Sequence, residues 1–283
     1  MNCILFELYL LLFIPIFTFS QQTKRATIKE TYTIQKLGFI DKCEIYVPII
    51  EDYEGHQKVI KMEYSKKPKY STYDFGAKRA MYELNSQDLD VIKTIEISYI
   101  IELNKFDLTE AKKQNNNVGL KKGEKKTYLT NTGFYKIDKD NFDSSYVLKD
   151  INTIEKIKTI NDFVVNQFSY VTFFGEDKGA NYAIKNKTGD CTEYSDLMVA
   201  LCRVNQIPAR RVSGYSINSD TVSVLNRIFK SSGHAWVEVF LEEHGWVPFD
   251  PTYCDAGDNI DFATLPNQLV YLRRSEGGKG FNW

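Results

Sequence analysis

Apolar residues recur with two different periods along this chain of 283 residues. From residue 26 to about residue 104 they alternate with polar residues, most clearly in the run KTIEISYIIEL at residues 93–103. Alternation of this kind predicts β-strands that bury one face. In residues 154–168 the apolar residues instead recur at intervals of three and four, which is the period of a helix with one buried face. A β region followed by a region that contains helices is therefore the expected organisation.

The first region contains further short runs that fit strands. They lie at residues 31–35, 44–50, 58–64 and 80–84. Turn signals separate the runs, among them Gly55 and Gly76, because glycine tolerates the positive φ of many tight turns. Five or more short strands without a convincing helix predict an antiparallel β-sandwich, which we assign to residues 21–110.

Charge is balanced over the chain as a whole. Lys and Arg number 36 against 37 Asp and Glu, so the formal net charge is −1. That balance argues against a nucleic-acid partner, which usually requires a basic excess or a basic stripe. The one basic stretch, AKKQNNNVGLKKGEKK at residues 111–126, is interpreted as solvated chain, and we predict a linker or loop over residues 111–127.

The second region, residues 128–283, combines helices with strands. One helix is predicted at residues 154–168, where Asn152 and Glu155 form a candidate capping box at its start. A second helix is predicted at residues 191–204. Strands are predicted at residues 211–216, 235–241 and 245–249. Helices followed by strands in one unit predict an α+β domain.

The chain begins with an apolar run, ILFELYLLLFIPIFTF at residues 4–19. The run is shorter than the roughly 20 residues of a membrane-spanning helix, and it leads into the polar residues that follow Ser20. We therefore predict that residues 1–20 are a signal peptide and that the protein is exported to the periplasm or the extracellular space. No Lys or Arg precedes the run, so a non-cleaved N-terminal membrane anchor is the alternative.

Export would place Cys43, Cys191, Cys202 and Cys254 in a compartment where disulfides form. Four cysteines are too few for a disulfide scaffold in a chain of this length, and the sequence contains no CxxC pair. We therefore predict neither a metal site nor a cofactor. Cys191 and Cys202 would lie about 16 Å apart along their predicted helix, which is too far for a disulfide between them. Cys43 and Cys254 are either paired or free.

Cys191 follows Gly189 and opens the second predicted helix. The free N–H groups and the positive dipole end of a helix N-terminus favour a thiolate. The same N–H groups can form half of an oxyanion hole, because they point to where charge develops on a substrate carbonyl. For an isolated cysteine, a small buried core residue is the alternative interpretation.

His234 and Asp250 lie near the two ends of a predicted β-hairpin. The returning strand brings Asp250 toward His234, although the register of the hairpin does not follow from the sequence. A cysteine nucleophile, a histidine base and an aspartate that orients the imidazole form the arrangement of nucleophilic acyl transfer. The other two histidines, His56 and His244, lie in predicted turns and are weaker candidates.

Four sequence blocks in this region together resemble the transglutaminase-like superfamily and occur in that family's order. They read GDCTEYSDL at residues 189–197, IPARRVSGY at 207–215, GHAWVEV at 233–239 and GWVPFDPT at 245–252. The resemblance implies a papain-like α+β fold with Cys191 as nucleophile, His234 as base and Asp250 as the orienting acid. The upstream β region is similar to the sandwich that often precedes this domain in exported bacterial members.

The resemblance also implies roles for residues around the predicted triad. Arg210 and Tyr215 would support the site from beneath, and we interpret both as parts of the core and its strands. Trp236 is predicted to bind substrate by lining the acyl pocket, with packing beside His234 as an equal alternative.

The resemblance does not identify the second oxyanion donor. Tyr170, Asn181 and Tyr182 are the candidates upstream of the nucleophile. No acidic cluster resembles the calcium sites of the animal cross-linking enzymes, so calcium dependence is not expected.

We therefore expect a cysteine-dependent acyl-transfer enzyme that acts on peptide or side-chain amide bonds of a protein or peptide substrate. Hydrolysis, as in a protease or amidase, is expected rather than cross-linking, because water competes with amines unless the site excludes it. The alternative is a catalytically silent binding or assembly module that uses the same fold as a scaffold. The intact set of Cys191, His234 and Asp250 argues against that alternative, and the sequence indicates no oligomeric state.

Overall fold

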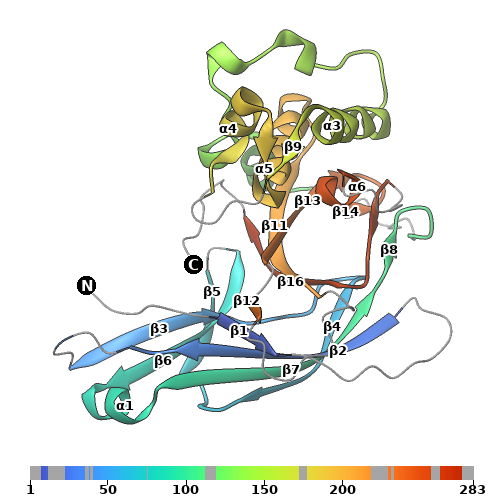
Figure 1. Cartoon of the computed structure of the whole chain (residues 1–283). Helices are drawn as coiled ribbons and strands as arrows, with labels where there is room; N and C mark the ends of the chain where they lie inside the picture. Colours follow the sequence, from blue (N-terminus) through green and yellow to red (C-terminus); the bar gives the residue numbers. More distant parts are fainter. Residues whose placement is uncertain are drawn as a thin grey trace.

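The computed structural model has the predicted α+β fold, with most of the helices gathered at one end of the molecule and the long strands at the other (Figure 1). It describes residues 8–11, 23–35, 38, 41–74, 76–111, 119–171, 177–217, 229–230, 233–255 and 262–275. The predicted order, in which a β region precedes the helices, is confirmed.

Two antiparallel sheets form the β region. The larger sheet has the strand order β12-β1-β2-β7-β4, and the smaller sheet has the order β3-β6-β5. The strands are β1 (Leu8–Leu11), β2 (Thr23–Thr33), β3 (Lys42–Pro48), β4 (Gln57–Tyr64), β5 (Tyr70–Asp74), β6 (Ala77–Asn85), β7 (Thr94–Asn104) and β12 (Phe229–Lys230). Each of the five strands predicted in this region overlaps one of them. From here on, "β region" means strands β2 to β7 and the loops between them.

The alternation in β7 reflects a strand with one buried face. Its buried residues are Ile95, Ile97, Tyr99, Ile101 and Leu103. The residues between them are partly exposed, so the predicted orientation is confirmed. The buried face of β7 packs with β2 against β3 and β6 in one hydrophobic core, as two layers of a sandwich do.

This core does not stop at the end of the β region. Four residues of the C-terminal region join the same buried cluster: Tyr215, Ile217, Val270 and Leu272. The main chains also meet, since the N–H of Arg274 donates to the carbonyl of Gly76 at 2.9 Å. Gly76 has a φ of +74°, and a Cβ there would lie 1.7 Å from the Arg274 carbonyl oxygen, so only glycine fits this contact. The two regions share a core, and the predicted domain boundaries stay predictions.

A buried carboxyl group lies within the shared core. Glu30 on β2 accepts hydrogen bonds from the hydroxyls of Tyr99, at 3.0 Å, and Tyr215, at 3.1 Å. Burial raises the pKa of Glu30 to about 7, although the tyrosine hydroxyls partly offset the effect.

Because the folded state holds the proton of Glu30 more tightly than the unfolded state does, this residue should make stability fall as pH rises. Between pH 4.5, its usual pKa, and about 7, the wild type should lose about 3 kcal/mol of unfolding free energy relative to Glu30→Gln. Urea unfolding of both proteins at about pH 4.5 and about pH 7.5 measures this difference. A difference that does not change with pH would contradict the prediction.

The C-terminal region places helices against a four-stranded antiparallel sheet of order β14-β13-β11-β16. The sheet strands are β11 (Ala209–Ser216), β13 (Gly233–Leu241), β14 (Gly245–Phe249) and β16 (Leu269–Ser275). The helices are α2 (Lys122–Leu129), α3 (Thr153–Gln167), α4 (Gly179–Asn186), α5 (Cys191–Val204) and α6 (Pro251–Asp255). Short elements complete it: β8 (Phe106–Asp107), β9 (Ser169–Tyr170), β10 (Thr188–Gly189), β15 (Thr264–Leu265), η1 (Gly133–Tyr135), η2 (Lys139–Asn141) and η3 (Ser144–Tyr146).

The local signals of this region are confirmed. Helix α5 has the predicted bounds, and α3 begins at the predicted capping box. In that box the N–H of Glu155 donates to Asn152 Oδ1 at 3.0 Å, and the N–H of Asn152 donates to Glu155 Oε2 at 3.1 Å. The β13–β14 hairpin pairs Val237 with Phe249 and Leu241 with Gly245.

Short helices are where the sequence-based predictions were wrong. Helix α1 (Ser86–Val91) interrupts the region predicted to hold only strands, since Asn85 and Asp88 cap each other and Leu89 is buried. Helix α2 covers residues 122–127 of the predicted linker, because Glu124 Oε2 accepts the N–H of Lys121 and Tyr128 is buried. Helix α4 was not predicted at all.

Most of the predicted signal peptide, like residues 112–118 of the predicted linker, lies outside the described residues. Within the first 20 residues only strand β1 is described, and it pairs with β2 and β12. Among the helices that the structure describes, none has both the length and the apolar character needed to cross a membrane. Export and a membrane anchor remain predictions.

Candidate active site

Cys191 occupies the first position of helix α5. The N-cap residue Asp190 accepts a hydrogen bond at 2.8 Å from the N–H of Thr192, which leaves the Cys191 N–H outside the helix's own bonds. A Cβ at Gly189 would lie 2.4 Å from the Cβ of Glu193, so the approach to Cys191 requires glycine. The predicted placement of this thiol at a helix N-terminus is confirmed.

The hairpin brings Asp250 to His234. Strand β14 ends at Phe249, and the next residue, Asp250, accepts a 2.6 Å hydrogen bond at Oδ2 from His234 Nε2. The other oxygen, Oδ1, accepts from the hydroxyl and the N–H of Thr252 at 2.7 and 3.1 Å. With both oxygens bonded, the carboxylate has a fixed orientation. The structure therefore supplies the register that the sequence left open.

The thiol of Cys191 also hydrogen-bonds His234, so the three predicted residues form one connected set. Because Nε2 of His234 is bonded to Asp250, Nδ1 is the ring nitrogen left to contact Cys191. Burial alone would lower the pKa of His234, but the charge and hydrogen bond of Asp250 outweigh it and Cys191 adds to their effect. The pKa of His234 is therefore raised well above its usual value, which favours an imidazolium beside the thiol.

Two aromatic rings flank the imidazole. Trp236 is near-parallel to it, with ring centroids 6.1 Å apart, and Tyr253 lies edge-to-face with a centroid distance of 5.3 Å. Trp236 is completely buried and belongs to a core cluster with Val212 and Tyr271. The packing alternative describes its position here, and contact between Trp236 and a substrate remains a prediction.

Of the three candidates for a second oxyanion donor, Tyr170 contacts the nucleophile. Strand β9 pairs in parallel with β10, so that Tyr170 lies opposite Gly189. The backbone N–H of Cys191 donates to the Tyr170 hydroxyl oxygen. Burial, followed by the charges of Cys191 and Asp190, raises the pKa of Tyr170, so its hydroxyl keeps its proton. A two-residue strand has no periodicity, and the sequence therefore gave no signal for this contact.

The other two candidates are engaged elsewhere. The side-chain amide of Asn181 donates to Asp138 and accepts from Asn141, at 2.8 and 2.9 Å. The ring of Tyr182 lies under the ammonium group of Lys178, 4.7 Å from the ring centroid.

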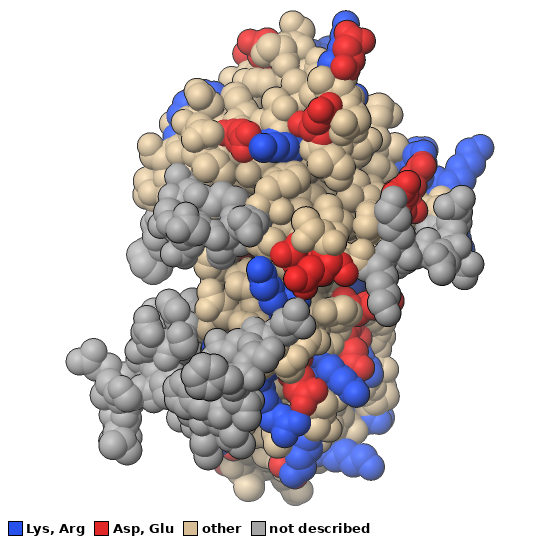
Figure 2. Space-filling model, turned by 90° about the vertical axis from the view of Figure 1, so that its right-hand side faces the viewer, with Lys and Arg blue, Asp and Glu red and all other residues tan. Residues whose placement is uncertain are grey.

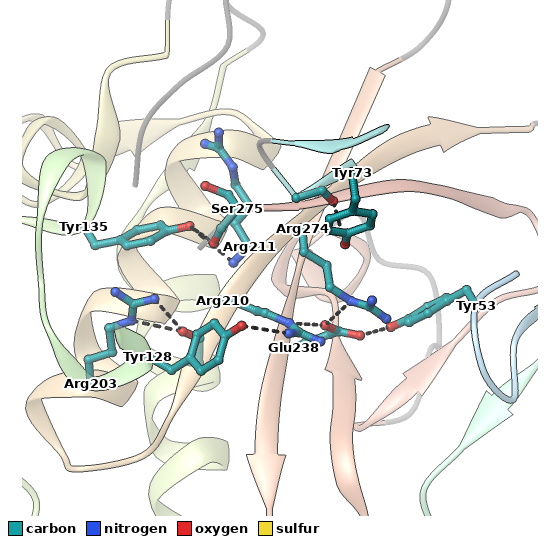
Figure 3. A network of polar contacts seen from close by, with 12 residues as sticks. Tyr53, Tyr73, Tyr128, Tyr135, Arg203, Arg210, Arg211, Glu238, Arg274 and Ser275 are labelled. Atoms are coloured by element: carbon teal, nitrogen blue, oxygen red, sulfur yellow. Dashed lines mark hydrogen bonds and ion pairs between the residues drawn. The ribbon is translucent and has the colours of Figure 1, made fainter. Parts of the chain in front are cut away.

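Buried charges join helix α5 to the sheet behind the site. Arg211 donates to both oxygens of Asp196 at 3.0 Å and to Asp177 at 2.9 Å. Nearby, Arg210, Arg274 and Tyr53 all bind the carboxylate of Glu238 (Figure 3). No sequence pattern indicated these pairings, although the interpretation of Arg210 as core structure is confirmed.

Apolar surface is exposed beside the nucleophile, and charge of both signs is mixed over one face of the molecule. Tyr170 and Val171, next to the nucleophile, each expose 45% of their surface. On the face shown in Figure 2, basic side chains lie beside acidic ones and neither sign forms a continuous field. Within the described part of the chain, no group of three or more His, Cys, Asp or Glu side chains is arranged to hold a metal ion.

Comparison with known proteins identifies the domain that contains this site. Residues 141–251 match the family model of the transglutaminase-like superfamily, which confirms the resemblance carried by the four sequence blocks. The matched segment includes Cys191, His234 and Asp250.

Two curated proteins are similar over parts of the chain. The uncharacterised protein YebA of Bacillus subtilis (strain 168) is 33% identical over 113 residues, which are 36% of this chain and 15% of YebA. A protein-glutamine gamma-glutamyltransferase of Pseudomonas aeruginosa is 33% identical over 90 residues, or 31% of this chain and 13% of that enzyme. The matches thus cover less than a sixth of either relative.

The fold as a whole has a solved counterpart. A protein from Cytophaga hutchinsonii, described as a candidate cysteine protease, has a TM-score of 0.60 and 17% identity. The similarity covers 90% of this chain and 82% of that one, so it extends through the β region. At this level of identity it shows a common fold.

Proposed function

We propose that this chain, whose residues 141–251 carry a transglutaminase-like domain, is a cysteine-dependent acyl-transfer enzyme acting on peptide or side-chain amide bonds. The observation that carries the proposal is the connected set of groups at one helix N-terminus. Cys191 starts helix α5 and hydrogen-bonds His234, and His234 is held at 2.6 Å by Asp250. This is the arrangement that a nucleophile, its base and an orienting acid require.

The chemistry follows from these positions. The Cys191 thiolate attacks the amide carbonyl carbon, and the carbonyl π electrons move to oxygen. When the C–N bond breaks, His234 Nδ1–H gives its proton to the departing amine, which leaves a thioester on Cys191. Water or an amine then attacks the thioester and gives a proton to His234, and the C–S bond breaks to restore the thiolate. Asp250 fixes the imidazole throughout.

Two donors are available for the developing oxyanion. The backbone N–H of Cys191 is directed outward from the helix start, and it contacts the Tyr170 hydroxyl in the free protein. A substrate carbonyl oxygen that takes this N–H would lie beside Tyr170, which retains its proton and can donate it as a hydrogen bond. Donors of this kind act mainly in the transition state, where the oxygen carries charge.

Hydrolysis is the proposed outcome. Once the thioester has formed, water competes with any amine unless closure of the site excludes it. The name of the Pseudomonas aeruginosa glutamyltransferase indicates the other outcome, transfer of the acyl group, but the match spans only 13% of that enzyme. Transfer to an amine is therefore the competing outcome, and product analysis with and without added amine separates the two.

Alkylation of Cys191 tests the proposal without a known substrate. We expect iodoacetamide to label Cys191 rapidly well below pH 7, because the raised pKa of His234 favours an imidazolium, and an imidazolium beside a thiol favours the reactive thiolate. In His234→Ala the low-pH labelling should disappear. Rates between about pH 4 and pH 9 are read from peptide masses after digestion.

Cys202 is the internal control, since it lies in the same helix and its thiol is buried. Burial raises the pKa of Cys202 to about 12, so it should stay unlabelled in the folded protein at every pH used. Labelling of Cys191 that begins only above about pH 8, equally in both proteins, would contradict the enzyme proposal. It would favour the silent scaffold instead.

A further inference from the structure

One of the two rings that flank His234 belongs to a residue with no assigned role. Tyr253, in helix α6, packs edge-to-face on the imidazole at a centroid distance of 5.3 Å. Its hydroxyl shares a 2.9 Å hydrogen bond with Ser216 Oγ on β11 and accepts a longer one, at 3.4 Å, from Gln268 Nε2. Tyr253 is thus attached at one end to the imidazole and at the other to the residue that precedes β16.

Strand β16 is contacted by three buried polar residues of the β region, Tyr53, His56 and Gln57, which we call the clamp. The Gln57 side chain pairs with Tyr271 as a strand residue would. Its Oε1 accepts the Tyr271 N–H at 2.8 Å, and its Nε2 donates to the Tyr271 carbonyl at 3.1 Å. His56 Nε2 donates to the carbonyl of Leu269 at 2.7 Å.

Tyr53, the third residue of the clamp, contacts the side chain of Tyr271 instead of its main chain. It stacks on Tyr271 with centroids 4.7 Å apart, and its hydroxyl donates to Glu238 on β13, the strand that also carries His234. Tyr53, Tyr271 and Trp236 belong to one buried cluster, and Trp236 lies along the imidazole. The clamp therefore reaches both rings that flank His234: Tyr253 by way of Gln268, and Trp236 by way of Tyr271.

We propose that Tyr253 is a positioning residue for His234 and that the β region, through the clamp on β16, fixes Tyr253 in place. The β region is then a working part of the active site and not an appended module. This inference rests on the proposed function, since it concerns the pair of Cys191 and His234. The pair of Cys191 and His234 then depends on residues outside the matched segment 141–251, namely Tyr253, the clamp and β16.

The physical reason is the geometry of the imidazole. His234 must direct Nε2 to Asp250 and Nδ1 to Cys191 at the same time, and rotation about its side-chain bonds breaks one contact or the other. The two flanking rings restrict that rotation. A catalytic group displaced by about 1 Å can lose up to about a hundredfold in rate, so a loosened Tyr253 should weaken the ion pair without unfolding the protein.

The test uses the pH dependence of Cys191 alkylation in the full-length protein, with Tyr253→Phe and Gln57→Leu. Tyr253→Phe keeps the ring and removes its hydroxyl bonds, and Gln57→Leu keeps the size of the side chain and removes its hydrogen bonds to Tyr271. In each variant we expect labelling at about pH 5.5 to slow by about tenfold. The pH midpoint of labelling should also rise, because a displaced imidazolium no longer favours the thiolate. A purely structural role for either residue would lower stability and leave this midpoint unchanged.

Tyr99→Phe is the matched control. It removes a buried hydroxyl of the β region that bonds Glu30 instead of β16, so it should keep the wild-type midpoint. All proteins are compared at the same interval below their melting temperatures, and unlabelled Cys202 verifies that each is folded. Rescue in Gln57→Glu at a pH low enough to protonate the new carboxyl would show that the hydrogen bonds themselves matter.

The outcomes separate the two proposals. Absence of low-pH labelling in the wild type would overturn the proposed function. Low-pH labelling in the wild type with an unchanged midpoint in Tyr253→Phe would overturn only the positioning role. The Tyr253→Phe result tests that role even if Gln57→Leu fails to fold. A shift in Tyr253→Phe with none in a folded Gln57→Leu would remove the β region from the inference.

Discussion

Replacing Cys191 with alanine should abolish turnover of every substrate that the wild type cleaves, by at least about 10⁴-fold, with little change in melting temperature. The loss is large because no other described group near His234 can form the thioester, and removal of a nucleophile leaves only binding and oxyanion stabilisation. Stability should change by no more than about 0.5 kcal/mol, since alanine is a good helix former and Cys191, although buried, is not among the residues of the described hydrophobic core clusters. The assay is a screen of peptides and amides by mass spectrometry, with a thermal melt of both proteins.

Cys202→Ala provides the opposite pattern. That thiol is completely buried in the same helix, so its removal leaves a small cavity and should lower stability by about 1 kcal/mol. Turnover should stay at the wild-type level because Cys202 lies about three helical turns from Cys191. Full turnover in Cys191→Ala would reject the covalent mechanism, whatever its melting temperature.

The parts of this site that could be predicted from the sequence are those built by local signals. Cys191 follows a glycine and a capping aspartate, so its place at a helix start depends on a few neighbouring residues. The hairpin that brings Asp250 to His234 has a short turn and two strands of clear pattern. Helix α3 was similarly defined by its capping box and its apolar face.

What could not be predicted depends on residues distant in sequence. Gln57 and Tyr271 are 214 positions apart, and nothing near either one shows that a side-chain amide will replace a strand neighbour. Tyr170 reaches Cys191 through a two-residue parallel pairing, which is too short to give a period. Helix α2 looked like linker because its charges dominate the sequence pattern, whereas Tyr128, near its end, is buried beside Arg210 and Trp246.

The buried carboxylate of Glu238 is the second feature with a large expected effect. Its side chain is fully buried and accepts hydrogen bonds from Arg210 Nε at 2.5 Å, from Arg274 Nε at 3.3 Å and from the Tyr53 hydroxyl (Figure 3). Arg210 also lies 3.7 Å from the ring centroid of Trp246. The carboxylate thus neutralises two guanidinium groups at the place where the β region meets β13 and β16.

Glu238→Ala should lower the unfolding free energy by about 3–5 kcal/mol, because it leaves two buried or half-buried guanidinium groups without their counter-ion. Urea unfolding measures this loss.

Glu102→Ala is the comparison: Glu102 pairs with Arg25 on the exposed face of the β region, and a surface pair of this kind contributes about 0–1 kcal/mol. Glu238→Gln separates charge from shape, and it should retain part of the hydrogen bonding while losing the neutralisation. Equal losses in Glu238→Ala and Glu102→Ala would mean that water or chain movement compensates Arg210 and Arg274, and that the junction between the two regions does not depend on this carboxylate.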